Sequence, residues 1–286
     1  MGCIIVLLNQ KGIAHMLYDR LRDALGECGV EYFGVLSYSD CRESSPHIIE
    51  RESFTPRSVI IYLLPYYGGE CVNISAYAAS RDYHLALREV NEKIGRCLDT
   101  YAEGATYRGY GDHSPIDERH AALSCGLGIL GKNGLLTNEK YGSYIFIGDM
   151  ITDIDPALLG AVTPAEYKYC HDCGACRAAC PTGILRGEGE ECLSAITQRK
   201  GELTDSEASL MRSYNTAWGC DVCQSVCPYN KNPRITPIEF FHRDRIEQLT
   251  RECLDSMSAA ELKSRAFGWR GRRVLERNLA ILSEDN

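Results

Sequence analysis

Cys170-His-Asp-Cys173-Gly-Ala-Cys176-Arg-Ala-Ala-Cys180-Pro181 is the stretch of sequence that decides how this chain folds. Its spacing is that of bacterial ferredoxins, in which three thiolates bind one [4Fe–4S] cluster and the fourth binds another. Downstream lie Cys192 and the segment Cys220-Asp-Val-Cys223-Gln-Ser-Val-Cys227-Pro228, which bring the thiols to the eight that two clusters require. The crossed ferredoxin pattern predicts one cluster on Cys170, Cys173, Cys176 and Cys227, and the other on Cys180, Cys192, Cys220 and Cys223.

A pair of structural zinc sites is the competing interpretation, because CxxC pairs also bind zinc. The longer pattern CxxCxxCxxxCP is unusual for zinc and favours iron–sulfur clusters. Seven of the 15 cysteines in the chain show no ligand spacing. We expect most of these seven to be small buried side chains; they are Cys3, Cys28, Cys41, Cys71, Cys97, Cys125 and Cys253.

The composition is that of an ordinary globular chain of 286 residues, with 44% hydrophobic and 24% charged residues. Its net charge of −8 argues against general binding of polyanions, so contact with a nucleic acid requires a local basic patch.

The segment 1–9 is predicted to be a first strand, because it lacks the basic region and cleavage site of a signal peptide. Val6 does not fit a myristoylation motif. No apolar run is long enough to span a membrane. These features predict a cytoplasmic protein, in which thiols stay reduced and clustered cysteines bind metal.

The first part of the chain, residues 1–160, mixes helical and strand-like patterns and is predicted to form an α/β or α+β domain. Apolar spacing predicts helices over His15–Leu25 and Ser75–Tyr101. Alternating or continuous apolar runs predict strands at Tyr32–Ser37 and Ser58–Leu64, and a hairpin at 134–138 and 143–149. Gly126-Leu-Gly-Ile-Leu-Gly131 matches a dinucleotide-binding pattern, but it follows a helical stretch and leads into a strand. The Rossmann motif requires the reverse order, so we reject a dinucleotide site.

The apolar periodicity of the sequence changes after residues 153–164. Residues 161–232 contain the eight clustered cysteines, and their apolar periodicity is weak because cluster ligation would order the segment. They are predicted to form a two-[4Fe–4S] ferredoxin-like module. Residues 233–286 are predicted to be helical, with helices over Arg245–Leu254, Ala259–Phe267 and Arg272–Leu282.

Five segments, taken together, resemble the epoxyqueuosine reductase family over roughly residues 55–280. They are Ile74-Ser-Ala-Tyr-Ala-Ala-Ser-Arg-Asp-Tyr-His84, Asp112-His-Ser-Pro-Ile-Asp-Glu-Arg119, Gly126-Leu-Gly-Ile-Leu-Gly-Lys-Asn133, Gly142-Ser-Tyr-Ile-Phe-Ile-Gly148 and Cys220-Asp-Val-Cys-Gln-Ser-Val-Cys-Pro228. The resemblance implies a cobalamin-binding domain similar to the core of reductive dehalogenases, joined to the two-cluster module. It also implies the reduction of epoxyqueuosine to queuosine at the wobble position of tRNA.

In the family, a carboxylic acid above the cobalt protonates the oxygen that epoxide opening releases, and Asp112 matches that position. A carboxyl group that faces an apolar corrin has its pKa raised by desolvation, which suits a general acid. The alternative is that Asp112 only caps a turn. Ser114 and Pro115 already form a good helix N-cap and N1 pair, with Asp117 at N3, so that role does not need Asp112.

The resemblance implies further site residues. Arg119 matches an arginine near the active site, or else is a solvated helix residue. Five other residues lie in matched motifs and either line the corrin or serve as turn residues; they are Ser75, Lys132, Asn133, Ser194 and Asp221.

The resemblance also implies a short form of the family. Members usually continue into a C-terminal helical-repeat domain that helps hold tRNA, whereas this sequence ends at Asn286. A basic patch is a candidate for replacing those tRNA contacts, although a solvated helix face is an equal alternative. It contains Trp269, the acid Glu276 and six basic residues: Lys263, Arg265, Arg270, Arg272, Arg273 and Arg277.

Three functions therefore stay open at the level of sequence. The first is a cobalamin-dependent epoxyqueuosine reductase that acts on tRNA and takes electrons from a low-potential donor such as ferredoxin or flavodoxin. The second is a dehalogenase-like cobalamin reductase of a small molecule. The third is a non-enzymatic electron-transfer protein.

Overall fold

The computed structural model describes residues 10–283 and divides them into two compact units. The first unit comprises residues up to Leu64 together with Leu87–Ile129 and Phe146–Lys168. The second unit comprises Pro65–Ala86, Leu130–Ile145 and the chain from Tyr169 onward. The strand expected at 1–9 lies outside the described residues.

A four-stranded sheet forms the centre of the first unit, with the strand order β1-β2-β6-β3. Its strands are β1 (Tyr32–Ser37), β2 (Ser58–Pro65), β3 (Tyr107–Tyr110) and β6 (Ile145–Thr152). β1 runs antiparallel to β2, and β3 runs antiparallel to β6 with Tyr110 opposite Asp149. Every residue of β2 is buried, because the strand lies inside the sheet and its sequence is a nearly continuous apolar run.

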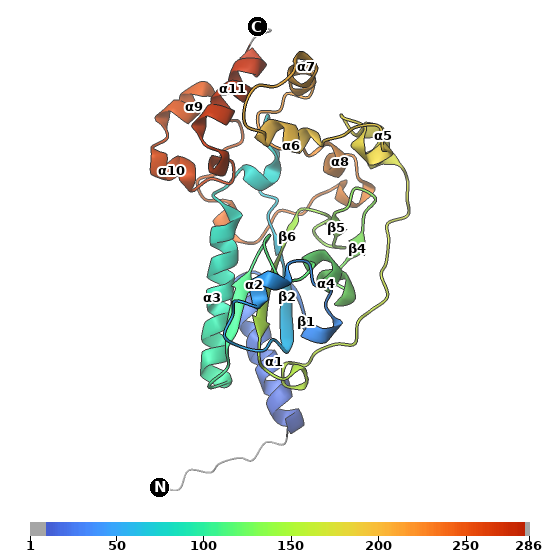
Figure 1. The fold of residues 1–286 in the computed structure, drawn as a ribbon, viewed down its shortest axis with the longest axis vertical. Helices are drawn as coiled ribbons and strands as arrows, with labels where there is room; N and C mark the ends of the chain where they lie inside the picture. The colour runs from blue at the N-terminus through green and yellow to red at the C-terminus, as the bar shows by residue number, and fades with distance from the viewer. Residues whose placement is uncertain (1–9, 284–286) are drawn as a thin grey trace. The chain divides into compact units, whose positions relative to one another are not determined.

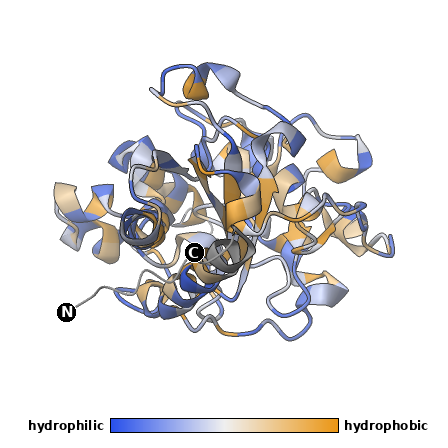
Figure 2. Ribbon diagram, turned by 90° about the horizontal axis from the view of Figure 1, so that it is seen from below, coloured by the Kyte–Doolittle hydropathy of each residue, from blue (hydrophilic) through white to orange (hydrophobic). Residues whose placement is uncertain are grey.

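Helices complete the first unit (Figure 1). They are α1 (Gln10–Glu27), α2 (Pro46–Ile49), α3 (Tyr83–Tyr101) and α4 (Glu118–Ser124), of which α3 begins in the second unit. Leu17, Leu21 and Leu25 recur at helical spacing on α1 and are buried. The ring of Tyr18 on α1 stacks on Phe33 of β1 at 5.2 Å. In Figure 2 the helices carry both hydrophilic and hydrophobic residues along their length, as amphipathic helices do.

The second unit is built from short elements. Its strands are β4 (Ile129–Leu130) and β5 (Leu136–Thr137), which form a two-stranded sheet. Its helices are α5 (Ala175–Ala179), α6 (Leu193–Gln198), α7 (Asp205–Ser213), α8 (Val222–Ser225), α9 (Arg251–Ser256), α10 (Ala259–Lys263) and α11 (Arg272–Ser283). A core of buried apolar side chains includes Trp218 and Phe267, whose rings meet edge to face at 6.4 Å.

The mixed helix-and-sheet class predicted from the sequence is confirmed, and the two strands predicted at Tyr32–Ser37 and Ser58–Leu64 are present. Two other predictions are wrong. The helix expected over Ser75–Tyr101 is a short 3₁₀ turn at Ala76–Ala78 followed, after a break, by α3. The expected hairpin does not form, because β5 pairs with β4 while β6 pairs inside the large sheet. Only its connecting turn is present, as an isolated bridge between Asn138 and Gly142.

The units also differ from the predicted division into 1–160, 161–232 and 233–286. The segments 65–86 and 130–145 come from the first part of the sequence but fold with the second unit. Hydrogen bonds such as Ser75 N to Trp218 O, at 2.8 Å, tie them there. The C-terminal helices α9 and α10 are shorter than predicted. Among residues 10–283, no helix combines the length and the apolarity needed to cross a bilayer.

Candidate functional site

Four of the clustered thiols line one small pocket in the second unit. They are Cys170, Cys173, Cys176 and Cys227, the set that the crossed spacing predicts for one cluster. The loop before α5 carries Cys170 and Cys173, and Cys176 follows in the first turn of α5. The loop reverses direction at Gly174, whose φ of 80° favours glycine. Burial raises the pKa of the Cys176 thiol, and the neighbouring thiols of Cys227, Cys170 and Cys173 raise it further.

The other four thiols form a second neighbourhood. Burial raises the pKa of Cys220 to about 11, and the nearby thiols of Cys192 and Cys180 add to this effect. Burial likewise raises the pKa of Cys223 to about 12, with Cys220 and Cys192 contributing. Each thiol therefore interacts with members of its own predicted set.

Cys180 lies in an environment suited to a thiolate. Its pKa is lowered because backbone N–H groups of Leu185, Thr182 and Gly183, together with the Thr182 hydroxyl, outweigh the opposing effect of burial. Donors of this kind stabilise negative charge on sulfur. The turn after Pro181 therefore favours the thiolate form of Cys180, which is the form in which cysteine binds a metal.

Lys132 and Asn133, which the sequence assigned either to the corrin lining or to turns, lie beside the first thiol group. Lys132 is 3.8 Å from the carboxylate of Asp172, and the Asn133 amide interacts with the thiol of Cys223. Their surroundings are therefore those of the cluster thiols.

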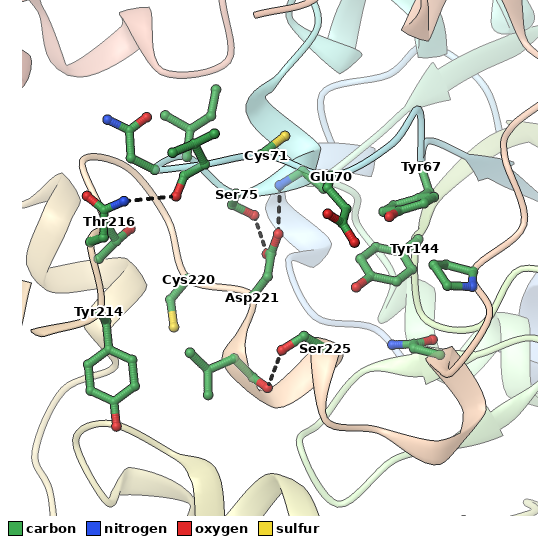
Figure 3. A pocket seen from close by; sticks show the side chains of 18 of the residues that line it. Tyr67, Glu70, Cys71, Ser75, Tyr144, Tyr214, Thr216, Cys220, Asp221 and Ser225 are labelled. Carbon is green, nitrogen blue, oxygen red and sulfur yellow. Dashed lines mark hydrogen bonds between the residues drawn. The ribbon is translucent and has the colours of Figure 1, made fainter. Parts of the chain in front are cut away.

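A larger cavity of about 430 Å³ also lies within the second unit. Ser75 and Asp221 line it, and Figure 3 shows the Asp221 carboxylate accepting hydrogen bonds from the Ser75 hydroxyl and from the backbone N–H of Ala76. The rings of Tyr67 and Tyr144, 4.7 Å apart, lie to one side of Asp221. Burial raises the pKa of Asp221, while its two donors oppose that shift.

Backbone pairing brings Ser75 and Asp221 together although they are far apart in sequence. Ile74 forms a parallel bridge with Trp218. Gly219 follows in a left-handed conformation with φ of 76°, and a Cβ at this position would lie 2.5 Å from the Cβ of Ser75. Only glycine allows so close an approach. Cys220, one of the predicted cluster ligands, lines the same cavity, so the second thiol group adjoins it.

Asp112 lies in the first unit, at the tip of a tight turn. Its φ is 62°, and the N–H of His113 donates to the carbonyl of Gly111 at 2.8 Å. This combination is the strained classic γ-turn, which is rare for residues other than glycine. Strain of this kind is concentrated at functional sites. The backbone N–H of Asp112 donates to Oε1 of Glu118 at 3.1 Å.

The capping prediction for this region needs a correction. The helix N-cap is Asp117, which accepts a hydrogen bond from the N–H of His120 at 3.1 Å, and not Ser114. Helix α4 is short and begins after Asp117, because a carboxylate at the N-cap satisfies its first free N–H groups. Asp112 is still not needed as a cap.

A pair of carboxyl groups beside Asp112 was missed by sequence reasoning. Asp149 is fully buried on β6, and Glu118 is half-buried in the first turn of α4. Burial, with the charges of Asp149 and Asp112, raises the pKa of Glu118 to about 9. Burial raises the pKa of Asp149 to about 7, although the nearby Ser114 hydroxyl and Glu118 carboxyl act in the opposite direction. The one acid within the apolar strand Ile145–Thr152 was the available signal.

Two predicted site residues lie elsewhere. Arg119 is exposed on α4 in the first unit. Ser194, on α6 in the second unit, accepts a hydrogen bond from the amide of Gln198 at 3.1 Å and neighbours Leu193, which lines the larger cavity.

The basic patch is smaller than the sequence suggests, because three of its arginines bind backbone carbonyls within the chain. Arg272 donates to Leu254 O and Met257 O at 2.7 Å, at the end of α9. Arg277 donates to Arg199 O at 2.7 Å after α6, and the buried Arg265 donates to Asp244 O. The exposed basic residues are Lys263 and Arg273, while the half-buried Arg270 stacks on Trp269 at 3.7 Å.

Comparison with known proteins agrees with these features. Residues 169–230 match the family model described as a 4Fe-4S double cluster binding domain, and this range contains all eight clustered cysteines. The prediction of two [4Fe–4S] sites rather than zinc sites is therefore confirmed at the level of the domain.

Curated relatives are epoxyqueuosine reductases. The protein of Aliivibrio fischeri is 38% identical over 59% of this chain and 46% of its own length. The protein of Gloeobacter violaceus is 33% identical over 70% of this chain and 65% of its own length. The chain spans about half the length of the first curated relatives it matches.

Solved structures show the same fold. An epoxyqueuosine reductase in complex with an epoxyqueuosine-modified tRNA-Tyr stem loop gives a TM-score of 0.77 at 24% identity, covering 94% of this chain and 81% of that chain. The epoxyqueuosine reductase of Bacillus subtilis gives 0.75 at 24% identity, with the same coverage. The resemblance to the epoxyqueuosine reductases is confirmed.

Proposed function

We propose that this chain is a cobalamin-dependent reductase that converts epoxyqueuosine to queuosine in tRNA, with electrons supplied through two [4Fe–4S] clusters. The observation that carries the proposal is its sequence identity to curated epoxyqueuosine reductases over most of its own length. The thiol groups and the strained Asp112 turn support it independently. Conversion of an epoxide to an alkene consumes two electrons and two protons and releases water, so the site needs an electron path and an acid.

The eight clustered cysteines are the proposed cluster ligands. One set lines the pocket of Cys170, Cys173, Cys176 and Cys227, and the other comprises Cys180, Cys192, Cys220 and Cys223. Because Cys220 lines the larger cavity, the second cluster adjoins that cavity. Cys173 is exposed, which makes the first cluster the proposed entry point for electrons from a low-potential donor such as ferredoxin or flavodoxin.

The larger cavity fits part of a cobalamin. Its lining combines hydroxyl, carboxylate and aromatic side chains, a donor set suited to the rim of amide groups on a corrin. Ser75 and Asp221 would hold that rim, with Ser194 at its edge. We assign Lys132 and Asn133 to the surroundings of the clusters instead, because they lie beside the thiols. When bound, cobalamin supplies strongly reducing, nucleophilic chemistry.

Asp112 is the proposed general acid. Its carboxyl group gives a proton to the oxygen atom that leaves the epoxide carbon, and solvent restores that proton. Arg119 is the proposed neighbour for substrate oxygen or phosphate groups, since it lies exposed on the helix that follows the Asp112 turn.

The proposed tRNA contacts involve fewer cations than the sequence suggested. Lys263, Arg273 and the Arg270–Trp269 pair are the part of the patch that is not occupied by backbone carbonyls.

A cytoplasmic site of action fits a tRNA substrate and reduced thiols. The three-part division of the chain at residues 160 and 232 stays a prediction about which parts carry which cofactor.

The test is anaerobic reconstitution with iron, sulfide and cobalamin, followed by incubation with epoxyqueuosine-containing tRNA at low salt and digestion to nucleosides. We expect queuosine to form and to require both cobalamin and a reductant. Failure to form queuosine, with the corrinoid shown to be bound and reduced, would favour the small-molecule reductase. Failure to bind corrinoid while both clusters assemble would favour the electron-transfer protein.

A further inference from the structure

The carboxyl pair of Glu118 and Asp149 lies outside the machinery assigned above. Asp149 is 0% exposed, and among residues 10–283 no hydrogen-bond partner of suitable geometry reaches either of its carboxylate oxygens. A buried ionised carboxylate without a donor is costly. Two ionised carboxylates cannot donate to each other, but a protonated Glu118 can donate to Asp149. A single proton between them supplies the missing donor.

Several groups around the pair are themselves acids, phenols or thiols. Asp112 raises the pKa of Glu118, and Asp149 raises the pKa values of Tyr62, Tyr110 and Cys41. The Ser114 hydroxyl also lies near Asp149. When two carboxyl groups share a low-dielectric site, the pKa of one of them is strongly raised. The surroundings therefore also favour one shared proton at neutral pH.

The other oxygen of Glu118 faces the strained turn. Oε1 accepts the backbone N–H of Asp112 at 3.1 Å, and this bond joins the His113-to-Gly111 hydrogen bond in holding the positive φ of Asp112. A strained conformation persists only where its surroundings fix it. A neutral Glu118 carboxyl group performs both tasks at once, since one oxygen donates to Asp149 and the other accepts from Asp112.

We propose that Glu118, through the proton it shares with Asp149, is the positioning residue that holds the γ-turn carrying Asp112. Loss of the shared proton leaves two negative charges in the core of the first unit, and their repulsion moves the Glu118 carboxylate away from Asp149 and releases the turn. The effect of this turn on the rate of catalysis rests on the proposed function of Asp112. The stabilisation of the turn by Glu118 does not depend on that function.

Substitution of Glu118 by glutamine and by alanine distinguishes the role of the shared proton from a general structural role of the side chain. Glu118→Gln keeps an oxygen that accepts from Asp112 N and an N–H that donates to Asp149, but it cannot ionise. Glu118→Ala removes both hydrogen bonds. Glu52→Gln is the matched control, because Glu52 accepts bonds from Arg108 and Tyr110 in the same unit and no hydrogen bond joins it to Asp112.

The experiment measures hydrogen–deuterium exchange of the peptide that contains Asp112, in the full-length protein with its clusters, from pH 6 to pH 10. Protection is expressed relative to the intrinsic exchange rate at each pH. In the wild type we expect steady protection at neutral pH and a loss approaching tenfold per pH unit once the pair has ionised. Glu118→Gln should stay within about twofold of its neutral value throughout, and Glu118→Ala should be unprotected at every pH.

Three outcomes would overturn the proposal: full protection in Glu118→Ala, an alkaline loss in Glu118→Gln equal to that of the wild type, or no alkaline loss in the wild type. If Glu118→Ala does not fold, the wild type and Glu118→Gln still decide the question. These measurements require no substrate and no cobalamin, so they stand even if no queuosine is formed. If queuosine is formed, kcat of the wild type should fall at alkaline pH. The Glu118→Gln variant should not show this alkaline decrease in kcat.

Discussion

Asp221 in the second unit and Asp149 in the first unit are both buried carboxyl groups, yet their surroundings differ. Asp221 accepts hydrogen bonds from the Ser75 hydroxyl and from Ala76 N at 2.7 Å beside the larger cavity, and these donors oppose the rise that burial gives its pKa. Among the described residues no hydrogen-bond partner of suitable geometry reaches Asp149, although the Ser114 hydroxyl and the Glu118 carboxyl near it oppose the rise in its pKa, and the proposed shared proton joins it to Glu118. Burial raises the pKa of both acids, and the groups that oppose this rise differ: Asp221 has two hydrogen-bond donors, whereas Asp149 has a hydroxyl and a second acid.

The largest expected effect concerns the first thiol group, in the pocket of Cys170, Cys173, Cys176 and Cys227. Cys173→Ser should remove one cluster, because the four thiols of its pocket bind one cube together and the weaker hydroxyl ligand does not replace a thiolate. Iron analysis of anaerobically prepared protein should fall from about eight atoms to about four per chain. Cys253→Ser is the control, since Cys253 lies outside both thiol groups, and it should retain all the iron. Equal iron in the two variants would contradict the ligand assignment.

The next largest effect is on turnover. Asp112→Asn preserves the size of the side chain and removes its transferable proton, so queuosine formation should slow by about 10²–10⁴-fold while clusters and corrinoid stay bound. The measurement is the single-turnover rate, accompanied by the absorbance spectrum of the cofactors. A rate close to that of the wild type would remove Asp112 from the mechanism.

A third experiment tests the difference between the two buried acids directly. Asp221→Ala leaves the Ser75 hydroxyl and Ala76 N–H without a partner, so we expect the free energy of unfolding to fall by about 1–3 kcal/mol. Asp149→Asn removes the single buried negative charge that the pair carries at pH 8, so its effect should be neutral or stabilising. Both are measured by anaerobic denaturant unfolding, with Ser225→Ala as a control for loss of a local hydroxyl bond. Equal destabilisation by the two substitutions would mean that the donors do not distinguish them.

The pH dependence of the free energy of unfolding tests the environment of the Glu118–Asp149 pair. The pKa of Glu118 is raised in the folded state, so between the ordinary carboxyl range and about pH 9 the folded chain binds more protons than the unfolded chain. Its contribution to stability is therefore complete at low pH and is lost as pH rises toward 9. Glu118→Gln lacks this loss, and its stability relative to wild type should rise by up to about 1.4 kcal/mol per pH unit. A constant difference between pH 6 and pH 9 would show that Glu118 titrates normally.

The smallest effect is expected at the basic patch. Lys263→Ala combined with Arg273→Ala should reduce the slope of log affinity for tRNA against log salt by roughly 0.7–0.9 for each phosphate that the variant no longer neutralises. The matched control is Lys200→Ala, an exposed lysine outside the patch. Arg272→Ala is not a suitable probe, because it also removes the hydrogen bonds that cap α9. An unchanged slope would assign the binding of phosphates to another surface.

The sequence by itself determined the parts of this protein in which chemistry depends on local spacing. The CxxCxxCxxxCP pattern places three thiols within one loop and one helical turn, and with Cys227 they line one pocket; the assignment of four ligands to each cluster stays a prediction. The continuous apolar run of β2 likewise predicted a buried strand, because only the interior of a sheet accommodates such a run.

Tertiary structure alone decided the parts that depend on contacts between distant segments. The pairing of Ile74 with Trp218 carries the segment 65–86 into the second unit and joins Ser75 to Asp221, and no local pattern encodes that bridge. The positions of Lys132 and Asn133 beside the first thiol group likewise depend on the fold. The Glu118–Asp149 pair exists only because α4 packs near β6, since the pKa of an acid depends on the charges and donors that folding brings to it, and these come from other segments of the chain.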